Sequence, residues 1–245
     1  MLHPEVENRT PFAFEALLAS DEAGRPLVVP ISKATYDILP GGSLDLADLQ
    51  KPVDFEGSSN GEPGASSLRV EPEVAFAKPA TDVVMVGHAH ALRGQTVVDV
   101  ELAVGSLAKR VRVTGDRVWT QRLGTPSPSP PLPFEKIPLV YERSNGGWDR
   151  SPADAHRHDF HPGNPVGVGY RTKHSRFIEG APLPNVEDPA APLTSYQGRG
   201  VPAGFGFISP HWESRRLFAG TYDAAWARER MPLLPRDFDR RHHVV

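Results

Sequence analysis

The density of proline and glycine constrains this chain more than any other feature of its sequence. There are 26 prolines and 22 glycines in 245 residues, scattered without a period. Proline lacks a backbone donor and glycine carries a large entropy cost on ordering, so both interrupt long helices. Scattered breakers are typical of short strands joined by turns. The sequence therefore predicts an all-β fold, mainly antiparallel and sandwich-like, with one short helix near the C-terminus.

Two segments have the alternating pattern of a hairpin. Apolar residues alternate on both sides of a turn at 21–24 within residues 11–39. They alternate again over residues 96–104 and 107–113, which Gly105 and Ser106 separate. A two-residue connection that begins with glycine suits a tight hairpin turn. We predict hairpins over both segments, with the strand that contains Pro30 at a sheet edge because proline cannot donate to a ladder.

Further elements are predicted from shorter signals. Apolar runs predict strands at 82–92 and 137–143, whereas 40–65 and 145–200 have the polar, glycine-rich composition of loops. The helix is expected over 224–230, after the capping residue Asp223 and before Pro232.

The chain is predicted to be a single domain over residues 1–245. A subdivision is suggested by the proline-rich segment 124–133, which separates an N-terminal β part at 1–123 from a loop-rich β part at 134–245. This segment is interpreted as a crossing between two sheets, with a docking peptide as the alternative.

Charge and cysteine content exclude several classes of protein. The net charge is −3 and Lys and Arg form no strong run, which argues against nucleic acid as a partner. The absence of cysteine excludes disulfides, thiolate metal sites and cysteine nucleophiles. No stretch is apolar enough to span a membrane, and the first residues lack the pattern of a secretory signal. The expected location is therefore the cytoplasm.

Motifs that carry a known chemical mechanism are missing from the sequence. It contains no GxSxG elbow, no HExxH helix and no P-loop. The remaining catalytic or metal candidates are histidines, of which His156, His158 and His161 form one group and His88 and His90 lie two apart on a predicted strand. Imidazoles on one face can chelate zinc. Because the larger group lies in a loop, which loses entropy when it orders ligands, solvated polar residues are the favoured interpretation of that group. For the pair on the strand, the favoured interpretation is one buried, hydrogen-bonded histidine.

Charged residues beside the apolar runs are a second candidate for chemistry. They are Lys33, Arg69, Glu71, Lys78, Asp82, Glu142 and Arg143. Paired carboxylates in a cleft can perform acid–base catalysis, but no spacing here singles out a donor and an acceptor. We interpret these residues as partly buried ion pairs that fix strand register, or as a solvated face.

A series of phrases along nearly the whole chain resembles a bacterial family, the domain-of-unknown-function family 2169. The phrases lie at residues 8 and 10–12, 33–36, 66–69, 78–83, 87–89, 115–117 and 119, 138–143 and 146–147, 164–167, 183–185 and 187, 202–206, 220–223 and 226, and 234–235 and 237–239. The chain departs from the family pattern after residue 239. Seven residues of the phrases are expected to be structural rather than binding residues: Lys33, Arg69, Lys78, Asp82, Arg143, Asn164 and Tyr222.

The resemblance implies a function in type VI secretion. Some members of the family are encoded beside secretion genes and serve as adaptors that hold a toxin effector and join it to the secretion spike, made of a valine-glycine-repeat protein and a PAAR-repeat tip. The expected protein is thus a non-catalytic adaptor or chaperone without a cofactor. Two alternatives stay open: a metal-dependent enzyme that uses the histidine group, and a structural or carrier domain of the secretion particle.

Overall fold

The chain forms two compact units, each built from separate stretches of sequence. The computed structural model describes residues 6–20, 26–74, 81–210, 212–218 and 228. The first unit comprises residues 1–57, 71–81 and 217–245, and the second comprises 58–70 and 82–216. The proline-rich segment 124–133 lies within the second unit.

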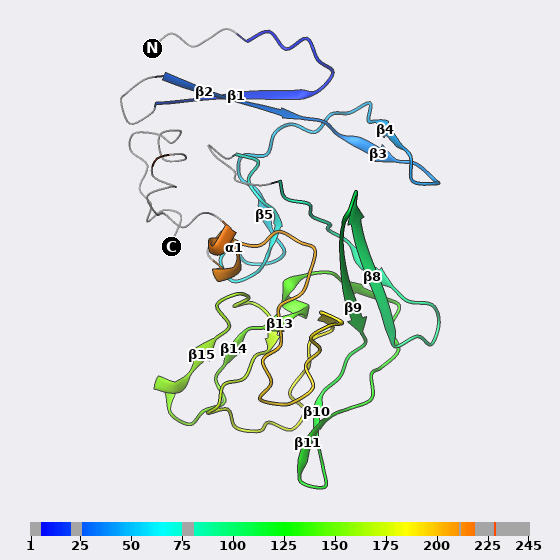
Figure 1. The fold of residues 1–245 in the computed structure, drawn as a ribbon, viewed down its shortest axis with the longest axis vertical. Helices are drawn as coiled ribbons and strands as arrows, with labels where there is room; N and C mark the ends of the chain where they lie inside the picture. The colour runs from blue at the N-terminus through cyan, green and yellow to red at the C-terminus, as the bar shows by residue number, and fades with distance from the viewer. Residues whose placement is uncertain (1–5, 21–25, 75–80, 211, 219–227, 229–245) are drawn as a thin grey trace. The chain divides into compact units, whose positions relative to one another are not determined.

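Two hairpins make up the strands found among the described residues of the first unit. β1 (Ala13–Ser20) pairs antiparallel with β2 (Pro26–Lys33), and β3 (Tyr36–Ile38) pairs antiparallel with β4 (Leu44–Leu46) (Figure 1). The hairpin predicted within residues 11–39 is therefore confirmed, although its turn lies outside the described residues. Each pair forms a two-stranded sheet of its own in the described part of the chain, so Pro30 lies on an edge strand.

The largest sheet of the second unit has three antiparallel strands. Its order is β17 (Val186–Glu187), β9 (Leu107–Thr114) and β8 (Val97–Val104), with the predicted turn at Gly105 and Ser106. β8 and β9 form a long hairpin in Figure 1. The alternation along β9 places its valines in the core and its arginines in solvent, which is why the sequence pattern identified this hairpin.

Short strands and turns account for the rest of the second unit. The other strands are β5 (Ser58–Ser59), β6 (Leu68–Val70), β7 (His88–His90), β10 (Trp119–Arg122), β11 (Thr125–Pro128), β12 (Lys136–Pro138), β13 (Asn145–Gly146), β14 (Trp148–Asp149), β15 (Asp159–Phe160) and β16 (Val168–Gly169). They form antiparallel pairs, except for the parallel pair of β13 and β16. The predicted antiparallel β fold is confirmed, in sheets of no more than three strands among the described residues.

Three predicted segments differ in the structure. Within 82–92 only β7 is a strand. Val83 and Val86, which belong to the apolar run that predicted a longer strand, are exposed and lie outside it. The segment 137–143 begins with the end of β12 but continues as the 3₁₀ helix η1 (Tyr141–Arg143). Residues of the expected linker 124–133 form β11, which pairs with β10.

The predicted helix 224–230 lies outside the described residues except for Arg228, which is helical. The expected short helix near the C-terminus is confirmed among the described residues as α1 (Glu213–Phe218), which begins before the predicted range. A second 3₁₀ helix, η2 (Ala155–Arg157), was not expected from the sequence. Neither a long nor a strongly apolar helix of the kind that crosses a membrane occurs among the described residues.

Two hydrophobic clusters form the core of the second unit. In the first, Val111 and Val113 of β9 meet Val186 of β17, and all three are completely buried. In the second, Trp119 packs edge-on against Tyr196, with 5.4 Å between ring centroids. An offset or edge-on arrangement is the favoured geometry of an aromatic pair. The core thus depends on strands that are far apart in sequence.

Candidate functional site: an exposed apolar hairpin

The predicted histidine group does not converge on a common point. His158 Nε2 lies 3.2 Å from the carbonyl oxygen of Pro152, whereas His161 Nδ1 accepts a hydrogen bond from the Gly163 N–H at 3.1 Å. Burial lowers the pKa of His161, which favours the neutral ring. His156 lies in η2 and is exposed. The described residues contain no group of three or more His, Asp or Glu side chains placed to hold a metal ion.

The second pair of histidines, on β7, lies in the open. His88 and His90 are both exposed, and their ring centroids are 6.3 Å apart. The expectation that one of them is buried is therefore wrong, because the buried position of the strand belongs to Ala89. The buried residue between them, Ala89, belongs to the core. The two rings therefore share one face of the strand, as its alternation requires.

Several of the family-phrase residues hold different segments of one unit together. Lys33 Nζ donates to the Glu73 carboxylate at 2.5 Å and to the Pro52 carbonyl at 2.9 Å. In the second unit, Arg215 pairs with Asp82 at 3.0 Å. These contacts join segments that are distant in sequence.

Two other family-phrase residues connect loops of the second unit. Asn164 is completely buried, and its Nδ2 donates to the carbonyls of Tyr141 and Asn145, both at 2.9 Å. Arg143 Nη1 donates to Asn185 Oδ1 at 3.1 Å. Arg69 is exposed on β6, and Lys78 and Tyr222 lie outside the described residues.

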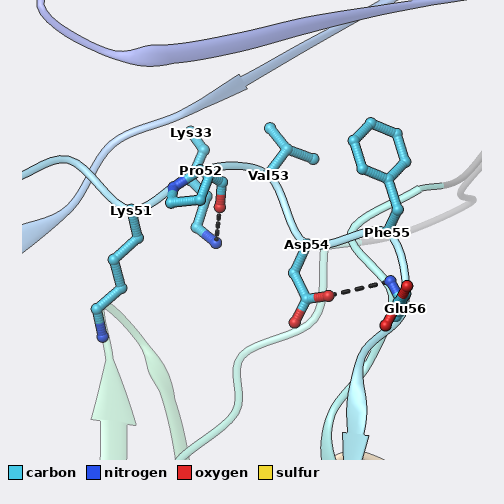
Figure 2. Close-up of a pocket in the computed structure, with 7 residues that line it drawn as sticks. All are labelled: Lys33, Lys51, Pro52, Val53, Asp54, Phe55 and Glu56. Atoms are coloured by element: carbon cyan, nitrogen blue, oxygen red, sulfur yellow. Dashed lines mark hydrogen bonds between the residues drawn. The ribbon is translucent and has the colours of Figure 1, made fainter.

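A shallow hollow of about 480 Å³ lies in the first unit beside Lys33 (Figure 2). Residues 51–56 form the rest of its wall. The Asp54 carboxylate accepts the N–H groups of Glu56 and Gly57 at 3.0 and 2.8 Å, so it shapes the turn. Lys33 donates to Glu73 and Pro52, so Lys33 and Asp54 stabilise the walls of this hollow rather than forming an acid–base pair.

The apolar face of the β3–β4 hairpin stands out as an exposed surface. Tyr36 lies opposite Leu46, and Ile38 lies opposite Leu44. Residues opposite each other on antiparallel strands share a face, so the four side chains form one patch. They are exposed by 48%, 37%, 78% and 64%, respectively. A contiguous apolar patch with this exposure is typical of an interaction site.

The base of this hairpin is held by a clasp of hydrogen bonds. The Gln50 side-chain amide accepts the Thr35 N–H at 2.8 Å and donates to the carbonyls of Thr35 and Ala47 at 3.0 and 2.7 Å. The Thr35 hydroxyl in turn accepts the Lys51 N–H at 3.0 Å. A two-stranded hairpin is marginal in water by itself. The clasp therefore explains how a short hairpin keeps its apolar face presented.

Sequence reasoning missed this surface. The segment 40–65 was predicted as a loop, although β4 lies within it. The signal that identifies the hairpin is local: Tyr-Asp-Ile and Leu-Asp-Leu flank a turn that contains Gly41 and Gly42, both with positive φ. Alternation over three residues is too brief to separate a strand from a loop.

Comparison with known proteins supplies a family and no closer relative. No curated protein and no solved structure is significantly similar to the chain. Residues 23–245 match the family described as "Uncharacterized protein conserved in bacteria (DUF2169)". The match extends over both compact units and includes the β3–β4 hairpin. The chain therefore belongs to the DUF2169 family.

Proposed function

We propose that the protein is a non-catalytic adaptor that binds a secreted toxin effector in the cytoplasm and couples it to the type VI secretion spike. The partners on the spike side are a PAAR-repeat tip and a valine-glycine-repeat protein. Family membership over residues 23–245, together with the family role stated above, motivates the choice of pathway.

The exposed apolar face of the β3–β4 hairpin is the observation that carries this proposal. Leaving Tyr36, Ile38, Leu44 and Leu46 in water forgoes the free energy that burial would provide, about 1.5–3 kcal/mol for a large apolar side chain. A partner that covers the hairpin gains this free energy of burial. Sheet edges and apolar strand faces are a recurrent means of peptide recognition.

One buried carboxylate of the second unit has a structural rather than a catalytic role. The buried Asp149 carboxylate accepts hydrogen bonds from Ser151, Thr172 and Ser175. Burial by itself raises a carboxyl pKa, but these hydrogen bonds outweigh it and hold the pKa of Asp149 at about 2. A carboxylate with so low a pKa and no remaining exposure is a poor general base near neutral pH.

Deletion of the gene in its host tests the proposed function. The abundance of the cognate effector is measured by immunoblotting in cells and in medium, with an unrelated spike cargo as the internal control. The adaptor role predicts that the effector falls in the medium, or in both fractions, while the control cargo is exported normally. Unchanged effector abundance and export in the deletion strain would refute the proposal.

A further inference from the structure

We propose that the outer edge of β3 accepts one strand of the partner protein, in which apolar residues alternate with lysine or arginine. This inference rests on the proposed protein-binding function and adds the chemistry of the segment that is bound. It follows from three features of the hairpin: the direction of its backbone groups, the closure of its other edge, and the charges on its second face.

The hydrogen bonds of the hairpin fix which backbone groups point outward. The Leu39 N–H donates to the Ser43 carbonyl at 2.8 Å, and the Ala47 N–H donates to the Thr35 carbonyl at 3.0 Å. Bonded and non-bonded pairs alternate along antiparallel strands. Asp37 and Asp45, which lie midway between these two bonded pairs, are therefore also a hydrogen-bonded pair. The backbone N–H and C=O groups of Asp37 thus point toward β4.

The backbone groups of Tyr36 and Ile38 consequently face away from β4. β3 and β4 form a two-stranded sheet, so no third strand among the described residues pairs with this edge. An unpaired row of N–H and C=O groups is a template for another strand. Both residues also contribute side chains to the apolar patch, which places backbone and apolar recognition on the same strand.

The outer edge of β4 is less open. Its outward Leu46 N–H already donates to the Asp45 carboxylate at 3.0 Å. A strand that added to β4 would have to displace this local hydrogen bond. The outer edge of β3 is therefore the favoured position for a partner.

The second face of the hairpin carries two carboxylates. Asp37 lies directly opposite Asp45, on the face away from the apolar patch. Like charges in opposite positions destabilise a strand pair, and a neighbouring cation relieves that repulsion. Because side chains of a strand alternate between faces, a partner beside β3 places one set of residues against the patch and the other beside Asp37. Apolar and basic residues in alternation match both faces.

The same charges disfavour a second copy of this chain as the occupant. Pairing of β3 with its own copy brings two Tyr-Asp-Ile segments together and adds further carboxylates to the face that already holds Asp37 and Asp45. An edge strand that carries like charges resists self-association. The occupant is thus a basic and apolar segment of a different protein.

The test measures binding of fluorescent peptides to the full-length protein by anisotropy. The probe alternates valine and lysine, and its matched counterpart alternates valine and glutamate. A third peptide repeats the valine–lysine sequence with the amides facing the protein N-methylated, which removes those backbone donors. We expect the valine–lysine peptide to bind about tenfold more tightly than the glutamate peptide, and N-methylation to abolish binding.

Charge reversal on the protein provides the second arm. Asp37→Lys leaves one cation opposite the Asp45 carboxylate and should remove the preference between the two peptides, whereas the same change at the exposed Asp48, outside the strands, should leave the preference unchanged. Circular dichroism verifies that both variants remain folded. Equal binding of the lysine and glutamate peptides, or full binding after N-methylation, overturns the strand-addition inference. The proposed function is tested separately, since effector export in the deletion strain does not depend on any peptide.

Discussion

Single residues in the second unit show how a protein this rich in loops retains a defined interior. The buried Asp149 carboxylate receives donors from Ser151 at 2.6 and 3.1 Å, from Thr172 at 3.0 Å and from Ser175 at 2.5 Å. Two segments of low regularity, residues 149–151 and 172–175, are thereby joined at one anion. Buried polar groups that are fully paired specify a structure, because each unpaired alternative carries a desolvation cost.

The low pKa of Asp149 makes stability dependent on pH in the acid range. Its folded-state pKa of about 2 lies below the unfolded value of about 3.9, so the carboxylate stabilises the fold above the unfolded pKa. This contribution, on the order of 2 kcal/mol, should be lost as the pH falls from about 4 toward 2. Urea unfolding at a series of pH values measures the effect. Asp149→Asn should lower stability near neutral pH and flatten this part of the profile; an unchanged slope would contradict the assignment.

Two arginine–carboxylate pairs allow burial to be compared at nearly constant chemistry. Arg117 and Glu187 pair at 2.5 Å with 14% and 6% of their side chains exposed, whereas Arg112 and Asp99 pair at 2.8 Å with 46% and 40% exposed. Breaking a buried pair leaves an uncompensated charge, while exposed pairs contribute little. Arg117→Met should cost about 3–5 kcal/mol of unfolding free energy and Arg112→Met less than about 1 kcal/mol. Denaturant titration of both variants decides the point, and equal losses would refute the distinction.

At the scale of elements, sequence patterns succeeded where alternation was long and a turn was explicit. The eight-residue strands β8 and β9, joined at Gly105 and Ser106, follow directly from such a pattern. The apolar run 83–86 predicted a strand incorrectly, because apolar character alone does not indicate which segment would pair with the run.

Contacts between segments that are distant in the sequence could not be predicted from local sequence patterns. Ser67 donates through its N–H and its hydroxyl to the Glu142 carboxylate at 2.6 and 2.7 Å, across 75 positions of sequence. The clasp at Gln50 joins two ends of one hairpin, but only the three-dimensional structure shows that a glutamine does so. The candidate surface was therefore not predicted, because it depends on contacts that the order of the residues does not show.

Removal of the clasp should loosen the β3–β4 hairpin without unfolding the protein. Gln50→Ala eliminates the hydrogen bonds to Thr35 and Ala47. Gln95→Ala is a matched control, because Gln95 accepts the Leu92 N–H at 2.9 Å in a loop of the other unit. Hydrogen exchange should accelerate at the Ala47 amide only in Gln50→Ala. Similar protection of that amide in both variants would show that the clasp does not hold the hairpin.

For the whole molecule, the described polar groups and the exposed apolar groups have separate tasks. Buried or partly buried ions such as Asp149, Glu187 and Lys33 fix loops and strands within their own unit. The β3–β4 hairpin instead presents apolar side chains and an open strand edge to solvent. A well-ordered interior together with an exposed apolar face and an unpaired strand edge suits a protein that functions by binding another protein.

The proposed binding of the effector through the β3–β4 hairpin is measured most directly by quantitative co-purification from the host. Tagged wild-type protein is compared with the Ile38→Asp/Leu44→Asp variant and with Leu92→Asp/Leu123→Asp, which alters two leucines exposed elsewhere. Isotope-labelled mass spectrometry quantifies the cognate effector in each eluate. We expect the effector to be lost with the hairpin variant and retained with the control variant. Equal recovery of the effector with folded hairpin variant and wild type would contradict it.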